Sequence, residues 1–127
     1  MHLPEVSNQN IQFLLNREEI VRQTAEQIMK DFGMFGVEIT FSGNTENAYH
    51  ELHSQLTDQI TDLFERKYDL LLSVLYQVDI SDRDIRKTRL ELPDYTDVEV
   101  VAHQVIVRDL KKVLLRRYFK MKGTSMY

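Results

Sequence analysis

The sequence contains no cysteine and no tryptophan, and it has only four glycines and two prolines. The absence of cysteine excludes disulfide bonds, thiolate metal sites and cysteine nucleophiles. It also agrees with a reducing compartment, and we expect a cytoplasmic protein. Because glycine and proline mark turns and helix ends, their scarcity favours a few long helices over many short strands.

Long apolar runs are also lacking, since no window approaches the roughly 20 apolar residues that a membrane-spanning helix requires. The first residues lack the basic start and apolar run of a secretory signal, so we expect no membrane association. With 127 residues, of which 43% are hydrophobic and 28% charged, the chain has the composition of one globular domain. We expect a single helical domain over residues 1–127, with residues 1–10 as a flexible arm and residues 123–127 as a tail.

Three stretches have the pattern of a helix N-terminus, in which a small polar residue caps free backbone N–H groups and an acidic residue follows three positions later. They begin at Asn16, Ser81 and Thr96, and each is flanked by apolar residues. From these starts and the apolar spacing, we predict helices over about residues 17–32, 81–87 and 97–121. Gly123 follows the last one at a position where glycine often ends a helix.

Apolar residues also keep a helical spacing from residue 45 to residue 79. A single helix of that length would measure about 52 Å, whereas a compact chain of this size has a radius of gyration of about 14 Å. We therefore expect a break near residues 65–68. The half after the break is apolar on nearly every side around residues 70–75, and we expect it at the centre of the core.

Two short segments, residues 37–41 and 88–92, alternate apolar and polar residues in the manner of a β-strand. A two-stranded ribbon is one interpretation, and two extended linkers are the other, because an isolated ribbon needs packing to persist. The predicted fold class is therefore mainly α. It is a compact bundle of three to four main helices plus a short helix, with this ribbon as a minor element.

The last predicted helix carries apolar residues on two sides. One stripe contains Ile106, Leu110 and Val113, and the roughly opposite side contains Val101, Val105, Leu115 and Phe119. A helix that packs against one neighbour needs an apolar stripe only a little over 100° wide. Either this helix is sandwiched between elements of its own chain, or one face binds another molecule, most commonly a second copy in a symmetric dimer. The second interpretation predicts a contact surface of Val101, Val105, Leu115 and Phe119, with Arg116 and Lys120 as rim charges.

Charge is distributed unevenly along the chain, whose net charge is −4. Residues 108–122 contain seven basic residues and one acidic residue, while residues 1–107 contain nine basic and nineteen acidic residues. The basic segment predicts either docking on acidic neighbours within the fold or binding to a polyanion. A nucleic acid would contact Lys111, Lys112, Arg116, Arg117, Lys120 and Lys122. The net negative charge of the chain makes a nucleic acid the less favoured partner.

Three histidines, His50, His53 and His103, are the weak candidates for a metal or small-molecule site. Glu46 precedes His50 by four residues, and Glu99 precedes His103 by four. Two-metal bundle proteins use a three-residue Glu-to-His step, and zinc needs three or four convergent ligands. We therefore expect no metal and no cofactor, and keep this site as the first alternative function.

No catalytic pattern is present in the sequence. There is no glycine-rich phosphate loop, no HExxH and no Ser/His/Asp grouping that predicts a nucleophile. We predict no catalytic residues and a non-enzymatic role in protein–protein interaction or self-association, as a homodimer or with a protein partner. Nucleic-acid binding through the basic C-terminal helix is the second alternative.

Overall fold

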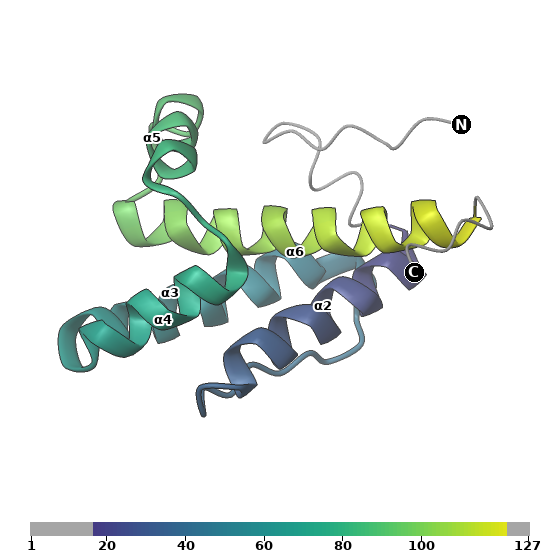
Figure 1. Cartoon of the computed structure of the whole chain (residues 1–127), viewed down its shortest axis with the longest axis horizontal. Helices are drawn as coiled ribbons and strands as arrows, with labels where there is room; N and C mark the ends of the chain where they lie inside the picture. Colours follow the sequence, from purple (N-terminus) through teal and green to yellow (C-terminus); the bar gives the residue numbers. More distant parts are fainter. Residues whose placement is uncertain (1–16, 122–127) are drawn as a thin grey trace.

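The computed structural model describes residues 17–121, which form five α-helices and a short 3-10 helix (Figure 1). The helices are α2 (Glu18–Gly33), α3 (Ala48–Arg66), α4 (Tyr68–Val78), α5 (Asp82–Glu91) and α6 (Asp97–Met121), and the 3-10 helix η1 covers Thr45–Asn47. The predicted mainly helical class is confirmed. The predicted arm, the Asn16 cap, the Gly123 stop and the tail lie outside the described residues.

α6 is the central element, because α2, α3, α4 and α5 all pack against it (Figure 1). Its buried apolar residues point to several sides of the helix: Val100, Ala102, Val105, Ile106, Val107, Leu110, Val113 and Leu114. The first interpretation of its two apolar faces, a helix sandwiched within its own chain, therefore holds for residues 100–114. No helix within residues 17–121 is both long and apolar enough to cross a bilayer.

Two of the three predicted N-terminal caps are present. The Ser81 hydroxyl accepts a hydrogen bond from the Asp84 N–H at the start of α5. At the start of α6, the Thr96 hydroxyl accepts from the Glu99 N–H, and the Glu99 carboxylate accepts from the Thr96 N–H at 2.9 Å. This reciprocal pair satisfies two backbone donors that a helix leaves unpaired.

The expected break in residues 45–79 occurs at Lys67. α3 ends at Arg66 and α4 begins at Tyr68, and Lys67 between them has φ −143° and ψ 61°, outside the helical region. The predicted central position of the second half is wrong. Leu71, Val74 and Val78 are buried, but the other side of α4 is exposed to solvent.

The predicted ribbon between residues 37–41 and 88–92 is absent. Residues 88–91 continue α5, which starts at the Ser81 cap and places Ile85 and Thr88 on one side, and Leu92 follows as its C-terminal cap residue. Thr88 is buried there, and its hydroxyl accepts a hydrogen bond from the Gln104 side chain of α6. Thr88 and Leu92 lie on the side that faces the core, but Leu90 between them is 84% exposed, so the alternation does not describe one face of this helix.

Residues 37–42 are extended without a partner strand, and side chains of α3 take the place of one. Gln55 accepts from the Thr40 N–H at 2.9 Å and donates to its carbonyl, Glu51 accepts from the Ser42 N–H, and Gln59 donates to the Glu38 carbonyl. Two extended residues advance about 6.6 Å, and four helical residues advance about 6 Å. Every second residue of the extended segment therefore lies opposite every fourth residue of α3. Val37 and Ile39 are buried on the alternate side.

Replacing Gln55 with alanine should lower the free energy of unfolding by about 1 to 2 kcal/mol, because the backbone N–H, the carbonyl and the hydroxyl of Thr40 all lose their partner. Chemical denaturation measures this change. Gln59→Ala is the matched control, since Gln59 makes one longer contact of 3.4 Å, and it should cost less. Equal effects of the two substitutions would contradict the proposed pairing.

Candidate functional site

The most prominent exposed apolar surface among the described residues is a row of side chains along α4, which we call the α4 stripe. It consists of Phe64 at the end of α3 and Tyr68, Leu72 and Tyr76 on α4, at intervals of four residues, which place the α4 residues on one side of the helix. Their exposed fractions are 57%, 51%, 48% and 87%. This surface was not predicted from the sequence, although the four-residue spacing and the apolar composition of residues 70–75 were its signals.

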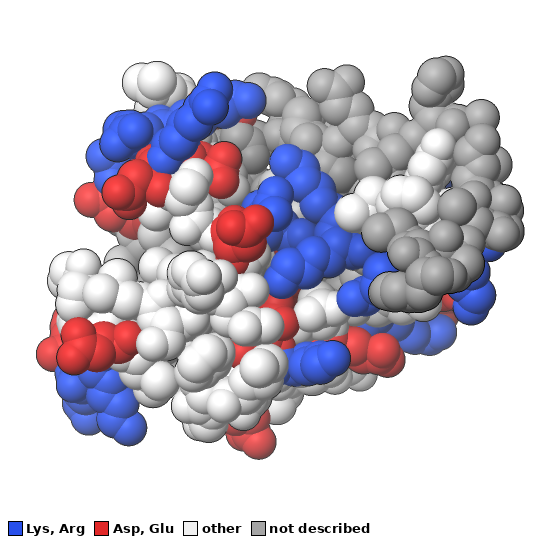
Figure 2. All heavy atoms as spheres, viewed as in Figure 1, with Lys and Arg blue, Asp and Glu red and all other residues white. Residues whose placement is uncertain are grey.

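The row extends from α3 onto α4. Phe64 and Tyr68 pack edge to face across the break, with ring centroids 5.6 Å apart. In Figure 2 a broad area of uncharged atoms lies where Figure 1 places α4. The exposed side of α4 also carries Asp69, Ser73 and Gln77, so the stripe is an apolar row with polar neighbours, a composition that suits binding to another protein.

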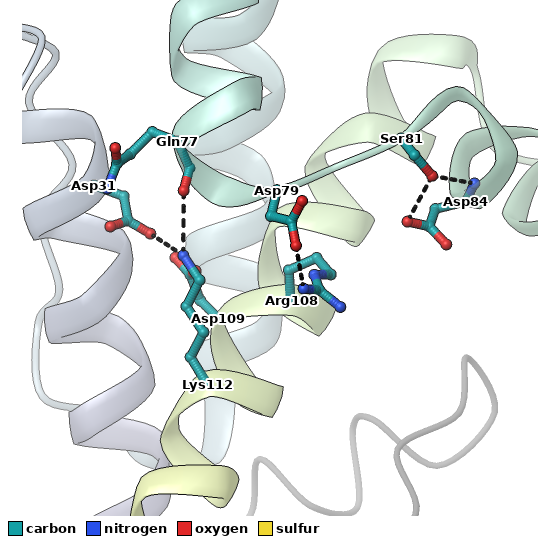
Figure 3. Close-up of polar contacts among 8 residues, drawn as sticks. All are labelled: Asp31, Gln77, Asp79, Ser81, Asp84, Arg108, Asp109 and Lys112. Carbon is teal, nitrogen blue, oxygen red and sulfur yellow. Dashed lines mark hydrogen bonds and ion pairs between the residues drawn. The ribbon is translucent and has the colours of Figure 1, made fainter. Parts of the chain in front are cut away.

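Charged residues lie at the two ends of the α4 stripe. Arg66 and Lys67 precede Tyr68, while Asp79 follows Val78, and all three are exposed. Asp79 has a left-handed backbone with φ 72°, which ends α4, and its carboxylate pairs with Arg108 of α6 at 2.8 Å (Figure 3). At the N-terminal end, Arg66 pairs with Asp62 at 3.1 Å, and the exposed Glu65 and Asp69 flank Lys67, so charges of both signs lie there.

The contact residues predicted on α6 are placed unevenly. Val105 is fully buried in the core, which corrects its assignment to a partner surface, and Val101 is partly buried against the same core. Leu115 is 45% exposed, and Phe119 is half-buried with its ring against Tyr118. The rim charges Arg116 and Lys120 are exposed, so only the C-terminal part of the predicted surface is open.

The basic segment of α6 docks mainly on α2, as the first interpretation of its charge predicted. Arg117 pairs with Glu19 at 3.0 Å, and Lys112 pairs with Asp31 at 3.2 Å. Arg116 donates to the side-chain oxygen of Gln27 at 2.6 Å. Lys111 is exposed, and Lys122 lies outside the described residues. The basic residues proposed for nucleic acid are thus divided between the fold and its surface.

His53 and His103 meet between α3 and α6, where they join Tyr49 and Tyr95. The Tyr49 hydroxyl is hydrogen-bonded to Nδ1 of His103 at 2.6 Å and to the Tyr95 hydroxyl at 3.0 Å. His53 donates from Nε2 to the Glu99 carbonyl and stacks on Tyr49. Burial lowers the pKa of His103 to about 4, and burial followed by the Tyr95 hydrogen bond raises the pKa of Tyr49.

These histidines do not form a metal site within residues 17–121, where no three acidic or histidine side chains converge on one point. His50 is exposed, and His50 and His53 lie on the wall of a pocket of about 490 Å³ at the start of α3 and α6. His103 is buried beneath it and hydrogen-bonded to Tyr49.

A buried polar cluster joins α2, α4 and α6 (Figure 3). Lys112 lies 3.2 Å from Asp31 and 3.3 Å from Asp109, and it donates a longer hydrogen bond to the Gln77 carbonyl. Both aspartates are buried, and Asp31 also accepts from Gln27 at 2.9 Å. One lysine therefore faces two buried carboxyl groups, which cannot both be charged without a large cost.

Asp109 is the carboxyl group of this cluster whose pKa is raised. As a carboxylate, neither of its oxygens accepts a hydrogen bond among the described residues. Burial, together with the hydrogen bond and the charge of Asp31, raises its pKa from 3.8 to about 8, and Lys112 acts in the opposite direction. A neutral Asp109 donates to Asp31 and leaves Lys112 with one charged partner.

Because folding raises the pKa of Asp109, its contribution to stability is complete below pH 3.8 and is lost as pH rises to about 8. Asp109→Asn removes this dependence and should raise the free energy of unfolding at pH 8 by about 1 to 3 kcal/mol. Denaturation at several pH values measures it, with Asp58→Asn at an exposed site as control. A variant less stable than the native chain at pH 8 would refute the shared proton.

His103 should titrate near pH 4 in the folded protein, as followed by NMR of its ring protons. Since folding lowers this pKa from 6.5, the contribution of His103 is present above pH 6.5 and is lost as pH falls towards 4. In that range the slope from His103 opposes the slope from Asp109. Titration of the His103 ring near 6.5 would show that it is not buried as described.

Comparison of the chain with known protein families, with curated protein sequences and with solved structures gave no match. No relative therefore supplies a function for any of these sites. Each site is therefore judged by its own geometry. Among them, the α4 stripe is the apolar surface that no other element of the described chain covers.

Proposed function

We propose that this protein is a non-enzymatic helical protein that self-associates through the α4 stripe. The observation that carries the proposal is the unburied second side of α4, with Phe64, Tyr68, Leu72 and Tyr76 in one row. Single exposed apolar residues are common on protein surfaces, but a continuous row along a helix is not.

A second copy of the chain is the partner we propose, because the row can pack against itself about a two-fold axis. If two α4 helices pack antiparallel about a two-fold axis near Leu72, Tyr68 of one copy lies opposite Tyr76 of the other. Lys67, which has no ion pair within residues 17–121, then approaches Asp79 of the second copy, while Arg66 and Asp79 keep their partners Asp62 and Arg108 within each copy. In this orientation the apolar row of one copy covers that of the other.

The area of the stripe is sufficient for a reversible dimer. A whole aromatic side chain contributes about 150 to 250 Å², so the exposed fractions of the four residues leave roughly 400 to 500 Å² on each copy. With the flanking polar residues, both copies together approach the roughly 1,200 Å² at which specific interfaces begin. The dimer is accordingly expected to dissociate on dilution.

Sedimentation velocity over a range of protein concentrations tests this proposal. Tyr76→Asp should shift the protein to monomer at concentrations where the native chain is a dimer, because it places a charge in the contact. Leu90→Asp is the matched control, since Leu90 is 84% exposed on α5 away from the stripe, and it should leave the dimer unchanged. Lys67→Glu should weaken the dimer, more at low salt than at high salt.

Two outcomes would overturn the proposal. A native chain that stays monomeric at high concentration would assign the α4 stripe to a different protein. A dimer lost on Phe119→Asp but kept on Tyr76→Asp would place the interface on the C-terminal part of α6, the surface predicted from the sequence.

A further inference from the structure

We infer that the groove between α2 and the C-terminal part of α6 is a binding site for a phosphate group on a small molecule. The groove has a volume of about 460 Å³, within the usual size of small-molecule sites. Lys30 of α2 and Arg116, Arg117 and Lys120 of α6 line it, and Glu26 is the one carboxylate on its wall. Four cations thus face one space.

The arginines of this groove are positioned without being fully neutralised. The neutral side-chain amide of Gln27 accepts from Arg116, and that of Gln23 accepts from Arg117 at 3.2 Å. Arg117 also pairs with Glu19, whereas within residues 17–121 no ion pair forms to Arg116, Lys30 or Lys120. An amide orients a guanidinium but leaves its charge available to a ligand.

The charge balance selects the class of ligand. Four cations against Glu26 and Glu19 leave an excess of two positive charges, which matches the charge of −1.5 to −2 on a phosphate monoester at neutral pH. The hydrogen bond and charge of Arg117, and more weakly Lys120, lower the pKa of Glu19, which agrees with a positive field at this end of the groove. A phosphate held by Arg116 and Lys120 would receive donors from neighbouring turns of α6.

The groove differs from an extended nucleic-acid surface. Lys112 points into the buried cluster with Asp31 and Asp109, and Lys111 is exposed outside the groove. The cations that remain together surround one space and do not form a long track along the helix. A compact anion fits this arrangement better than a polymer with phosphates at regular intervals.

Calorimetric titration of the full chain with inorganic phosphate and with AMP tests the inference, with adenosine as the uncharged control. We expect saturable binding of both phosphates and none of adenosine. Arg116→Gln and Lys120→Gln should each weaken binding about 10-fold, because each removes a charged donor. Lys111→Gln removes the same charge from the same helix outside the groove and should change affinity less than about twofold.

Glu26→Gln provides a second, opposite test, since removing the carboxylate from the groove wall should tighten phosphate binding. A purely structural role of these residues would not produce a gain of affinity. Lys120 and Glu26 are exposed, so these variants should fold, and thermal melting curves check that they do.

The inference fails if neither phosphate nor AMP binds saturably to the native chain. It also fails if Lys111→Gln weakens binding as much as Lys120→Gln, because the effect would then reflect net charge alone. A single-stranded DNA oligonucleotide that binds more tightly than AMP and loses affinity equally in both lysine variants would assign the cations to nucleic-acid binding instead.

Discussion

The burial of α6 on several sides is the constraint on which the rest of the structure depends. Each of the other four described α-helices packs against it, and its buried residues include polar ones, His103, Gln104 and Asp109. Buried polar groups are tolerated only when they are paired. Each of the four helices supplies a partner for a polar residue of α6: α2 through Asp31, α3 through Tyr49, α4 through the Gln77 carbonyl and α5 through Thr88. The polar pairs therefore fix how each helix sits around α6, while the apolar residues supply most of the stabilisation.

The sequence predicted those elements whose signals are local. The caps at Ser81 and Thr96 depend on residues three positions apart, and the break at Lys67 followed from the length of an apolar pattern compared with the size of the chain. The ribbon was predicted wrongly because an alternation of only five residues, 88–92, is a weak signal, and the helix that starts at the Ser81 cap continues through it and leaves Leu90 exposed. The pairing of residues 38, 40 and 42 with Gln59, Gln55 and Glu51 could not be read from local pattern, since it depends on how two distant segments align.

The candidate sites were harder to predict, for a related reason. Two apolar sides on a helix show that one of them needs a second partner, but not whether that partner comes from the same chain. For α6 the chain itself covers Val105, and for α4 it leaves Tyr76 exposed. The same ambiguity applies to charge: Lys112 and Arg116 belong to one basic segment, yet the first is part of a buried cluster and the second faces a groove.

The two apolar sides of α4 also have a consequence for how the chain selects one folded structure. Turning α4 about its own axis would exchange Leu71 and Val74 for Leu72 and Tyr76 in the core, and hydrophobicity alone would distinguish weakly between the two arrangements. The orientation must then be set by the joints at its ends, the single non-helical residue Lys67 and the left-handed turn at Asp79. Since one residue corresponds to about 100° of helical rotation, a one-residue insertion at either joint would present a different side of α4 to the core. The length of these two joints is therefore under tighter constraint than the identity of the residues in them.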